Sequence, residues 1–228
     1  MLKAEIYKLF HSKNLFILLM VIIPVALYLG IMLPQMGVAS IEEVLVMVFV
    51  GASAVIMLYF AVLATMLINR DYSSNSYRIL VGMGISRIKI FLSKYFIFLL
   101  VGIIVVALHG GVASIFPCVI FVDDIKWSNF FTSFLYIVVY ASIISCMFLL
   151  ATIGRSVIKS IAFNVAFILL MSILSMLPLS YVKIFPLQFL QMVADGQNEQ
   201  YVKIAIASLV YIIISGMASY LVFEKQEL

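Results

Sequence analysis

Residues 70–94 form the most charged stretch of the chain, RDYSSNSYRILVGMGISRIKIFLSK, and separate two apolar runs that are each long enough to cross a bilayer. The stretch holds five of the fourteen basic residues, namely Arg70, Arg78, Arg87, Lys89 and Lys94. A polar segment between two spanning runs must lie in water on one face of a membrane, and a basic excess is typical of the cytoplasmic face. The sequence therefore predicts a cytoplasmic loop here.

Local signals predict structure inside this loop. Ser73 and Ser74 are residues of a type that caps helices, and they precede a short apolar run. Gly82 and Gly84 follow that run and favour a helix end. Ser86 is placed to cap the next helix. We expect a short helix between two turns rather than an unstructured connection.

Outside this stretch the chain is too apolar for a soluble domain. Of its 228 residues, 66% are hydrophobic and 11% are charged. One soluble core could not hide that much apolar surface, so the composition and the long apolar runs indicate an all-α integral membrane protein. The net charge of +4 does not imply a nucleic-acid partner, because the charges divide between the two sides of the membrane.

Six apolar runs are long enough to be transmembrane helices. The predicted spans are residues 15–33, 44–69, 95–116, 131–153, 161–182 and 204–223. Residues 1–13 carry an apolar helical face and three lysines, so we expect an amphipathic interfacial helix on the inner leaflet, with an unstructured tail as the alternative. The first run is longer than the core of a usual signal peptide and no small-residue cleavage pattern follows it, so we expect it to be retained.

The basic residues predict the orientation. With the N-terminus inside, eleven of the fourteen lysines and arginines fall in inner segments, and three, Lys126, Lys183 and Lys203, fall outside. This division predicts that both termini are cytoplasmic. No internal repeat or linker divides the chain, so we expect residues 1–228 to form a single transmembrane domain.

Five polar residues within the predicted spans are candidates for a substrate path: His109, Asn164, Ser142, Ser145 and Ser172. An ionisable group inside a membrane is a functional candidate, which singles out His109. The two glycines after it favour the alternative that His109 reaches interfacial water where another helix packs closely. For Asn164 an interhelical hydrogen bond is the stronger interpretation, and the serines are equally ordinary in helix packing.

The sequence predicts no metal site and no protease site. Glu42 and Glu43 raise the hypothesis of an intramembrane metalloprotease, whose zinc needs converging carboxylates and histidines. Both glutamates fall at the outer mouth of the second span, His109 is the one histidine within a span, and the chain has no H-E-x-x-H. Cys118 and Cys146 lie too far apart along the predicted helices for a disulfide.

The last outer segment, residues 183–203, joins an apolar stretch to a polar tip. We expect a short helix or re-entrant piece at the outer interface, placed to cover a cavity. The many methionine and phenylalanine side chains favour a cavity that adapts to apolar cargo, although each is as readily a packing residue.

The plan of the chain and the motif in residues 70–94 resemble the permease subunits of ABC-2 type transporters, particularly small bacterial permeases for bacteriocin or lantibiotic immunity and peptide export. In that family the loop between spans two and three reads as an acidic residue, a Gly-Thr pair, an Arg-x-Leu, and a Ser-Arg leading to a Lys. The corresponding residues here are Asp71, Arg78-Ile79-Leu80, Ser86-Arg87 and Lys94, whereas Asn75-Ser76 stand in place of the Gly-Thr pair.

The resemblance implies that the loop is a coupling helix seated in a groove of a separate ATPase. Its coupling residues would be Asp71, Tyr77, Arg78, Ser86, Arg87 and Lys94, with Tyr77 and Arg78 as the expected contacts. The chain has no G-x-x-x-x-G-K-[ST] motif, so it is not itself an ATPase, and ATP and Mg²⁺ belong to the partner. Family analogy further implies two ATPase copies and two permeases, as a homodimer or with a closely related second chain, in the bacterial cytoplasmic membrane.

The expected cargo is an amphipathic or membrane-active peptide, or a lipid-like molecule, that is moved outward. No charged residue falls in the middle of a predicted span, so a hydrated ion or sugar would meet little to replace its water. A small ion-coupled carrier, which needs mid-membrane carboxylates, is therefore disfavoured. A membrane scaffold or sensor that docks a cytoplasmic partner and moves no substrate is the open alternative.

Overall fold

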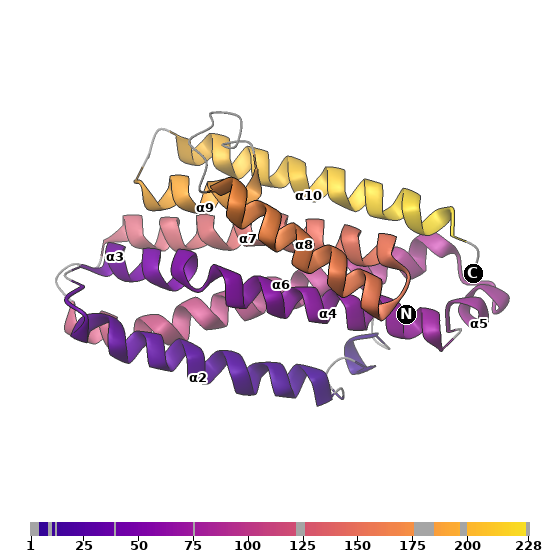
Figure 1. The fold of residues 1–228 in the computed structure, drawn as a ribbon, viewed down its shortest axis with the longest axis horizontal. Coiled ribbons are helices and arrows are strands. Elements are labelled where there is room, and N and C mark those ends of the chain that lie inside the picture. Colours follow the sequence, from indigo (N-terminus) through magenta and orange to yellow (C-terminus); the bar gives the residue numbers. More distant parts are fainter. Residues whose placement is uncertain are drawn as a thin grey trace.

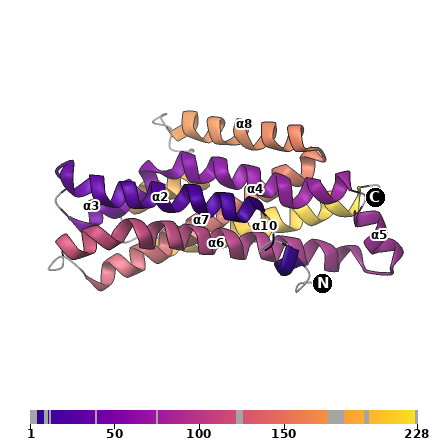
Figure 2. The same cartoon turned by 90° about the horizontal axis from the view of Figure 1, so that it is seen from below.

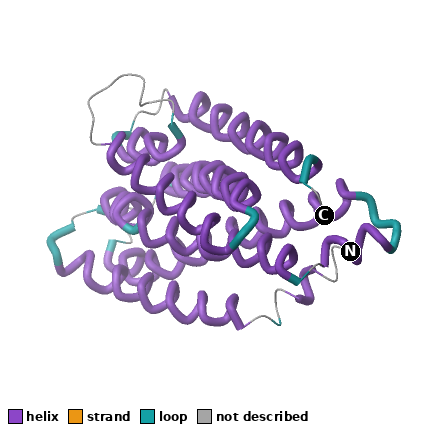
Figure 3. The backbone as a smooth tube through the Cα atoms, turned by 45° about the vertical axis from the view of Figure 1, so that its right-hand side comes forward, coloured by secondary structure: helices purple, strands orange, loops and turns teal. Residues whose placement is uncertain are grey.

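The computed structural model describes residues 5–8, 11, 13–38, 40–74, 76–121, 126–175, 185–196 and 200–226. Within these ranges the chain forms helices and short turns, and no strand (Figure 3). The helices are α2 (Lys13–Gln35), α3 (Ile41–Val46), the π-helical turn η1 (Met47–Gly51), α4 (Ser53–Ser73), α5 (Ser76–Gly82), α6 (Arg87–Ile120), α7 (Trp127–Gly154), α8 (Val157–Ser175), α9 (Pro186–Ala194) and α10 (Tyr201–Glu224). Residues 5–8 form a further helical turn.

The long helices run side by side in an elongated bundle (Figure 1). α5 and the two marked chain ends lie at one end of this bundle, which we call the α5 end. α3 and α9 lie at the opposite end, which we call the α9 end. The sequence predicts that the short helix of the charged stretch lies on the same side of the membrane as both termini. The placement of α5 and the two chain ends at one end of the bundle agrees with this arrangement.

α7 is the central helix of the bundle. It packs against α4, α6, α8, α9 and α10. Its buried side chains include Tyr136, Tyr140, Ile144 and Phe148, which are large and apolar enough to fill the space between these neighbours. α8, by contrast, lies at the edge of the bundle (Figure 2), and most of its side chains face outward. An apolar outer surface of this kind is suited to contact with lipid.

Four helices are long and apolar enough to cross a membrane: α6, α7, α8 and α10. The bent pair formed by residues 41–51 and 53–69 meets the same criterion as a fifth. Within the described residues α2 contributes a shorter apolar stretch, Leu19–Gln35. Length and composition therefore support four or five of the predicted spans, and the sixth stays a prediction.

The second predicted span, residues 44–69, is not one straight helix. It breaks after the π-helical turn η1, and the two parts meet at 41°. A π-helical turn and a glycine are common causes of such a bend, and Gly51 ends η1. The Tyr140 hydroxyl donates to the Phe49 carbonyl oxygen at 2.5 Å, which satisfies a backbone acceptor inside the turn. The predicted span is therefore present as a bent pair of helices, and nothing in the apolar pattern marks the turn between them.

The third predicted span lies within a longer helix. α6 starts at Arg87 rather than near Tyr95 and has 34 residues. A helix of that length extends about 51 Å, whereas the hydrocarbon core of a bilayer is about 30 Å thick. Residues 87–94 are therefore the first turns of a helix that begins directly after Ser86, as the sequence predicts, and that projects beyond its spanning part.

The fifth predicted span is described as far as Ser175, and residues 176–184, with Pro178, lie outside the described residues. The short helix predicted within residues 183–203 is present as α9. Pro186 stands in its first turn, where a missing N–H costs nothing, and Leu187, Phe189 and Leu190 are buried. This helix is packed into the α9 end of the bundle.

Candidate functional site

The charged stretch folds as two long helices joined by the short helix α5. α4 continues to Ser73, α5 spans Ser76–Gly82, and α6 starts at Arg87, with Ser86 in its N-cap position. The Ser86 hydroxyl makes no cap bond, and the Ser73 side chain lies outside the part of the chain that the structure describes. The predicted short helix is therefore confirmed, whereas the cap bond predicted for Ser86 at the start of α6 is absent.

Gly84 ends α5. Its φ is +80°, in the left-handed region that favours glycine. The Ile85 N–H donates to the Leu80 carbonyl oxygen at 3.1 Å, and the Gly84 N–H donates to that of Val81 at 2.9 Å. These two bonds form a Schellman motif, which turns the chain sharply towards α6. The predicted stop signal at this glycine is confirmed.

Tyr77 anchors α5 to the bundle. Its side chain is 2% exposed, and its hydroxyl donates to the Ile68 carbonyl oxygen at 3.2 Å. Its ring lies 4.6 Å from that of Tyr72 and 5.3 Å from that of Phe223 between ring centres. Burial raises the pKa of Tyr77 well above its usual value, so it stays a neutral donor. The side chain expected to contact a partner thus points inward and positions the helix instead.

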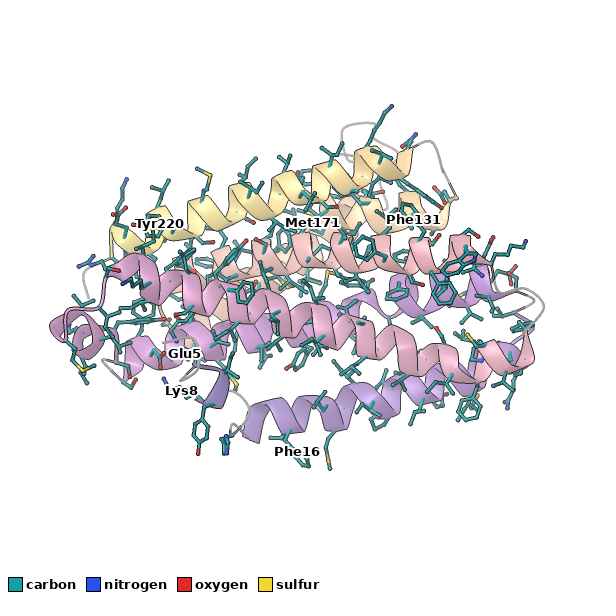
Figure 4. The ribbon with its side chains drawn as sticks, turned by 180° about the vertical axis from the view of Figure 1, so that it is seen from behind. Glu5, Lys8, Phe16, Phe131, Met171 and Tyr220 are labelled. Atoms are coloured by element: carbon teal, nitrogen blue, oxygen red, sulfur yellow. The ribbon has the colours of Figure 1, made fainter. Side chains whose placement is uncertain are left out.

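Four charged side chains meet beside Tyr77. The Lys94 ammonium donates to Asp71 and, at 3.2 Å, to Glu5, and the Lys8 ammonium donates to Asp71 at 3.1 Å. Figure 4 shows Glu5 and Lys8 next to each other near the end of the bundle that carries Tyr220. We call Glu5, Lys8, Asp71 and Lys94 the ion cluster. It joins the helical turn at residues 5–8 to α4 and α6.

The ion cluster is largely shielded from water. The Lys94 and Asp71 side chains are 3% and 6% exposed, whereas that of Lys8 is 56% exposed. Burial alone would raise the pKa of Asp71, but the Lys94 and Lys8 ammonium groups outweigh it and hold that pKa below its usual value. The Lys94 ammonium also lies 5.5 Å from the centre of the Tyr77 ring. Two carboxylates and two ammonium groups make the cluster neutral in total.

Sequence reasoning missed half of this cluster. Lys8 is one of the three lysines of the predicted interfacial helix, and nothing in that prediction indicated its bond to Asp71. The signal that was available is the isolated acid Asp71 among five basic residues, since a buried carboxylate needs cationic partners. Other residues of the predicted interfacial helix, 1–4, 9–10 and 12, lie outside the described residues.

Arg87 holds the last turn of α10. Its guanidinium donates to the carbonyl oxygens of Glu224 at 2.7 Å and Gln226 at 3.1 Å, acceptors that a helix end leaves without partners. The Gln226 amide in turn donates to the Thr152 carbonyl oxygen at 2.9 Å. Arg87 therefore ties the start of α6 to α10 and, through Gln226, to α7.

The exposed surface of α5 consists of the residues that do not point at the bundle. Ile79 is 60% exposed, Met83, directly after α5, is 64% exposed, and Arg78 is exposed as well. A basic group flanked by two large apolar side chains at the tip of a rigid hairpin is suited to a protein contact. Of the two expected contacts, Arg78 is on this surface and Tyr77 is not.

The candidate substrate-path residues do not converge on one cavity. Ser142 and Ser172 donate to carbonyl oxygens in their own helices, at 2.7 and 2.9 Å. The side-chain amide of Asn164 likewise donates to the Ser160 carbonyl oxygen at 2.9 Å, within α8. This is not the interhelical hydrogen bond that the sequence suggested. Ser145 differs, because its hydroxyl lies 2.5 Å from that of Tyr95 on α6 and also bonds to Ser215 on α10. It is a helix-packing residue between three helices.

His109 is buried by close helix packing. Its side chain is 2% exposed, and its ring lies beside the Val48 backbone without a hydrogen bond of normal geometry. A Cβ atom added at the adjacent Gly110 would clash with the Phe49 ring, so the glycine lets α6 approach η1. The close helix packing that the alternative expects beside these glycines is present, and His109 is buried there.

Within the described ranges, no three His, Cys, Asp or Glu side chains gather where they could hold a metal ion. Cys118 and Cys146 are both free thiols. At the α5 end the described residues form ion pairs and hydrogen bonds, and they present a surface suited to docking.

A family model described as "ABC-2 family transporter protein" matches residues 1–175 of the chain. The matched part includes the ion cluster, α5 and the spanning helices up to α8. No curated protein matches the chain.

Proposed function

This chain belongs to the ABC-2 family of transporter proteins, and from this premise we propose that it is the transmembrane subunit of an exporter driven by a separate ATPase. The sequence has no phosphate-binding loop of the G-x-x-x-x-G-K-[ST] type, so ATP and Mg²⁺ would be bound by the partner. The family match supports the transport assignment, and α5 is the element best suited to receive the partner.

The observation that carries this proposal is the contrast between the two faces of α5. Tyr77 on the inner face is 2% exposed, whereas Ile79 and Met83 on the outer face are 60% and 64% exposed. The outer face also carries Arg78. In this proposal the ATPase offers an apolar groove with an acidic rim, which Ile79 and Arg78 would fit.

Movement of the ATPase would reach the spans through rigid contacts. α5 is continuous with α4 and α6 through turns of only a few residues, and Tyr77 packs it against α10 through Phe223. The ion cluster fixes the bases of α4 and α6 to each other through Asp71 and Lys94. A displacement of α5 would therefore move α4, α6 and α10 together rather than bend a flexible loop.

The assembly that we propose has two permease copies and two ATPase copies in the bacterial cytoplasmic membrane, because six spans are half of the usual twelve. α2 would supply the sixth span of each copy. The α5 end would face the cytoplasm, in agreement with the division of basic residues along the sequence. Membrane lipid would cover the apolar surface of α8 and α10.

The cargo that we propose is an amphipathic or membrane-active peptide, moved from the inner leaflet or the bilayer to the outside. The spans offer many apolar side chains and hydroxyl groups, and the described residues put no carboxylate in the middle of a spanning helix. Such a lining suits a cargo with an apolar face better than a hydrated ion.

The proposed function is tested by purifying the chain in complex with its ABC ATPase partner and measuring ATP turnover in nanodiscs. Arg78→Ala should reduce peptide-stimulated turnover about tenfold, because it removes the charge from the docking face. Lys203→Ala, which removes an exposed charge at the α9 end, is the matched control and should leave turnover unchanged. Equal turnover of both variants would show that the docking site lies elsewhere.

A further inference from the structure

Two of the cavities at the α9 end are bounded by both α3 and α7. The first has a volume of 260 Å³ and an almost entirely apolar lining that includes Val44, Phe49 and Phe130; we call it the apolar cavity. The second has a volume of 210 Å³ and we call it the polar cavity. Leu45 and Asn129 line both of them, so the two cavities are neighbours that share one wall.

The polar cavity is lined by groups that accept hydrogen bonds. These are Glu42 from α3, Ser128, Asn129, Thr132 and Tyr136 from α7, and Tyr201 from α10. No lysine or arginine is among the described residues that line it. Asp195 lies between Ala194 and Gly196, which do line it, and adds a second carboxylate close by. The lining therefore favours a cation.

The Tyr136 hydroxyl points to a ligand independently of these carboxylates. Tyr136 is 0% exposed, and its ring stacks on that of Phe49 at 4.8 Å. Among the described residues its hydroxyl oxygen has no hydrogen-bond partner, and the groups that act on it electrostatically are Tyr201 and Asp195, on the side of the polar cavity. A buried hydroxyl without a partner is destabilising, so most such groups in proteins bond to another protein group, a water molecule or a ligand.

We propose that the two cavities form one binding site for a cationic amphiphile, with the ammonium group of a cargo peptide's lysine between Glu42 and Tyr136 and the apolar part of the cargo in the apolar cavity. This rests on the proposed export function for the identity of the cargo, and it narrows that cargo to peptides that carry a positive charge beside an apolar face. The cation is organic rather than metallic, because the described residues offer no cluster of three ligating side chains.

The smallest probe with this chemistry is octylammonium, which is positively charged at neutral pH. Trp127 is the single tryptophan of the chain, it precedes Ser128 and Asn129 in the lining, and its ring lies 5.7 Å from that of Phe130. Its side chain is 87% exposed and lines neither cavity, so its fluorescence reports occupancy through the neighbouring Phe130, which lines the apolar cavity. The full-length chain in phosphatidylcholine nanodiscs is titrated with octylammonium, octanol and octanoate, and the signal from empty nanodiscs is subtracted.

The expected result is saturable binding of octylammonium at least about tenfold tighter than that of octanol, and no binding of octanoate. Glu42→Gln should weaken octylammonium about fivefold, and Tyr136→Phe about threefold, while octanol binding stays the same. Glu43→Gln is the matched control, since it removes the same charge from the same turn of α3 but lines neither cavity. It should bind as the unchanged protein does.

Three results would overturn the site. Octanol that binds as tightly as octylammonium would show partition into an apolar pocket only. Equal losses in Glu42→Gln and Glu43→Gln would show a general surface charge effect. Weaker octylammonium binding when a third of the lipid is phosphatidylethanolamine would assign the site to a lipid headgroup instead of cargo. Binding is measured without an ATPase, so a failed binding test counts against this site and not against the transport assignment. Failed ATP turnover with intact binding counts against the transport assignment and not against this site.

Discussion

The ammonium of Lys94 lies 3.2 Å from the carboxylate of Glu5, although 89 positions of sequence separate the two residues. This contact, together with the bond from Lys94 to Asp71, closes the base of the α4–α5–α6 hairpin against the N-terminal turn. A docking helix transmits motion only if its base is rigid. The ion cluster supplies that rigidity, and its members can be tested one at a time.

Lys94→Met should destabilise the protein by about 3 kcal/mol, because it leaves Asp71 buried without its closest cation. Lys89→Met, on the same helix but exposed, should change stability by less than about 0.5 kcal/mol. Both are measured by denaturant titration in detergent. Similar values for the two variants would mean that the cluster does not hold the hairpin.

The contribution of Asp71 should depend on pH in one direction. Its pKa is lowered from 3.8, since the effect of Lys94 and Lys8 exceeds that of burial. A carboxyl group with a depressed folded pKa stabilises the fold fully above its unfolded value, and this stabilisation is lost as pH falls from 3.8 through the folded pKa. The stability difference between the unchanged protein and Asp71→Asn should therefore be constant near neutral pH and shrink in acid. A difference that grows in acid would contradict the ion pairing.

Gly84→Ala should destabilise the end of α5 by about 1–2 kcal/mol, because an alanine at φ +80° is strained. Gly82 offers the matched control, since it is helical and no atom lies within 4 Å of an added Cβ. Gly82→Ala should be neutral or stabilise the helix slightly. Hydrogen exchange of the α5 amides measures both effects, and equal protection in the two variants would rule out the strained turn.

Introduced cysteines can test the orientation. Met36 is 77% exposed beyond the end of α2, and Met83 is 64% exposed at the end of α5, on opposite ends of the bundle. In a background where Cys118 and Cys146 are replaced by alanine, Met36→Cys should react with an impermeant maleimide added to intact cells and Met83→Cys should react only after permeabilisation. The reverse pattern would invert the predicted topology.

The spanning helices and α5 follow from local signals in the sequence. The helices α7 and α10 begin and end within a few residues of the predicted runs, because an apolar run in a bilayer must satisfy its own backbone as a helix. α5 follows from the glycines after it. The start of α6 at Arg87 follows from Ser86, whereas charge marks where a helix leaves the bilayer and not where it ends.

The remaining features depend on contacts between residues far apart in the sequence, which the spacing of apolar residues does not predict. The break at η1 depends on Phe49 and its bond from Tyr140, which are 91 positions apart. The burial of Tyr77 depends on Phe223 at the far end of the chain. The polar cavity combines α3, α7, α9 and α10, so Glu42 could be recognised from sequence only as an acid at an outer mouth.

The central claim, that the outer face of α5 docks to an ATPase, is tested most directly by photocrosslinking. A photoreactive amino acid replaces Ile79, which is 60% exposed on α5, or Val119, which is 72% exposed near the other end of α6. In the assembled complex we expect a crosslink to the ATPase from position 79 and none from position 119. An intact complex with no crosslink from position 79, or with equal crosslinks from both positions, would contradict the account.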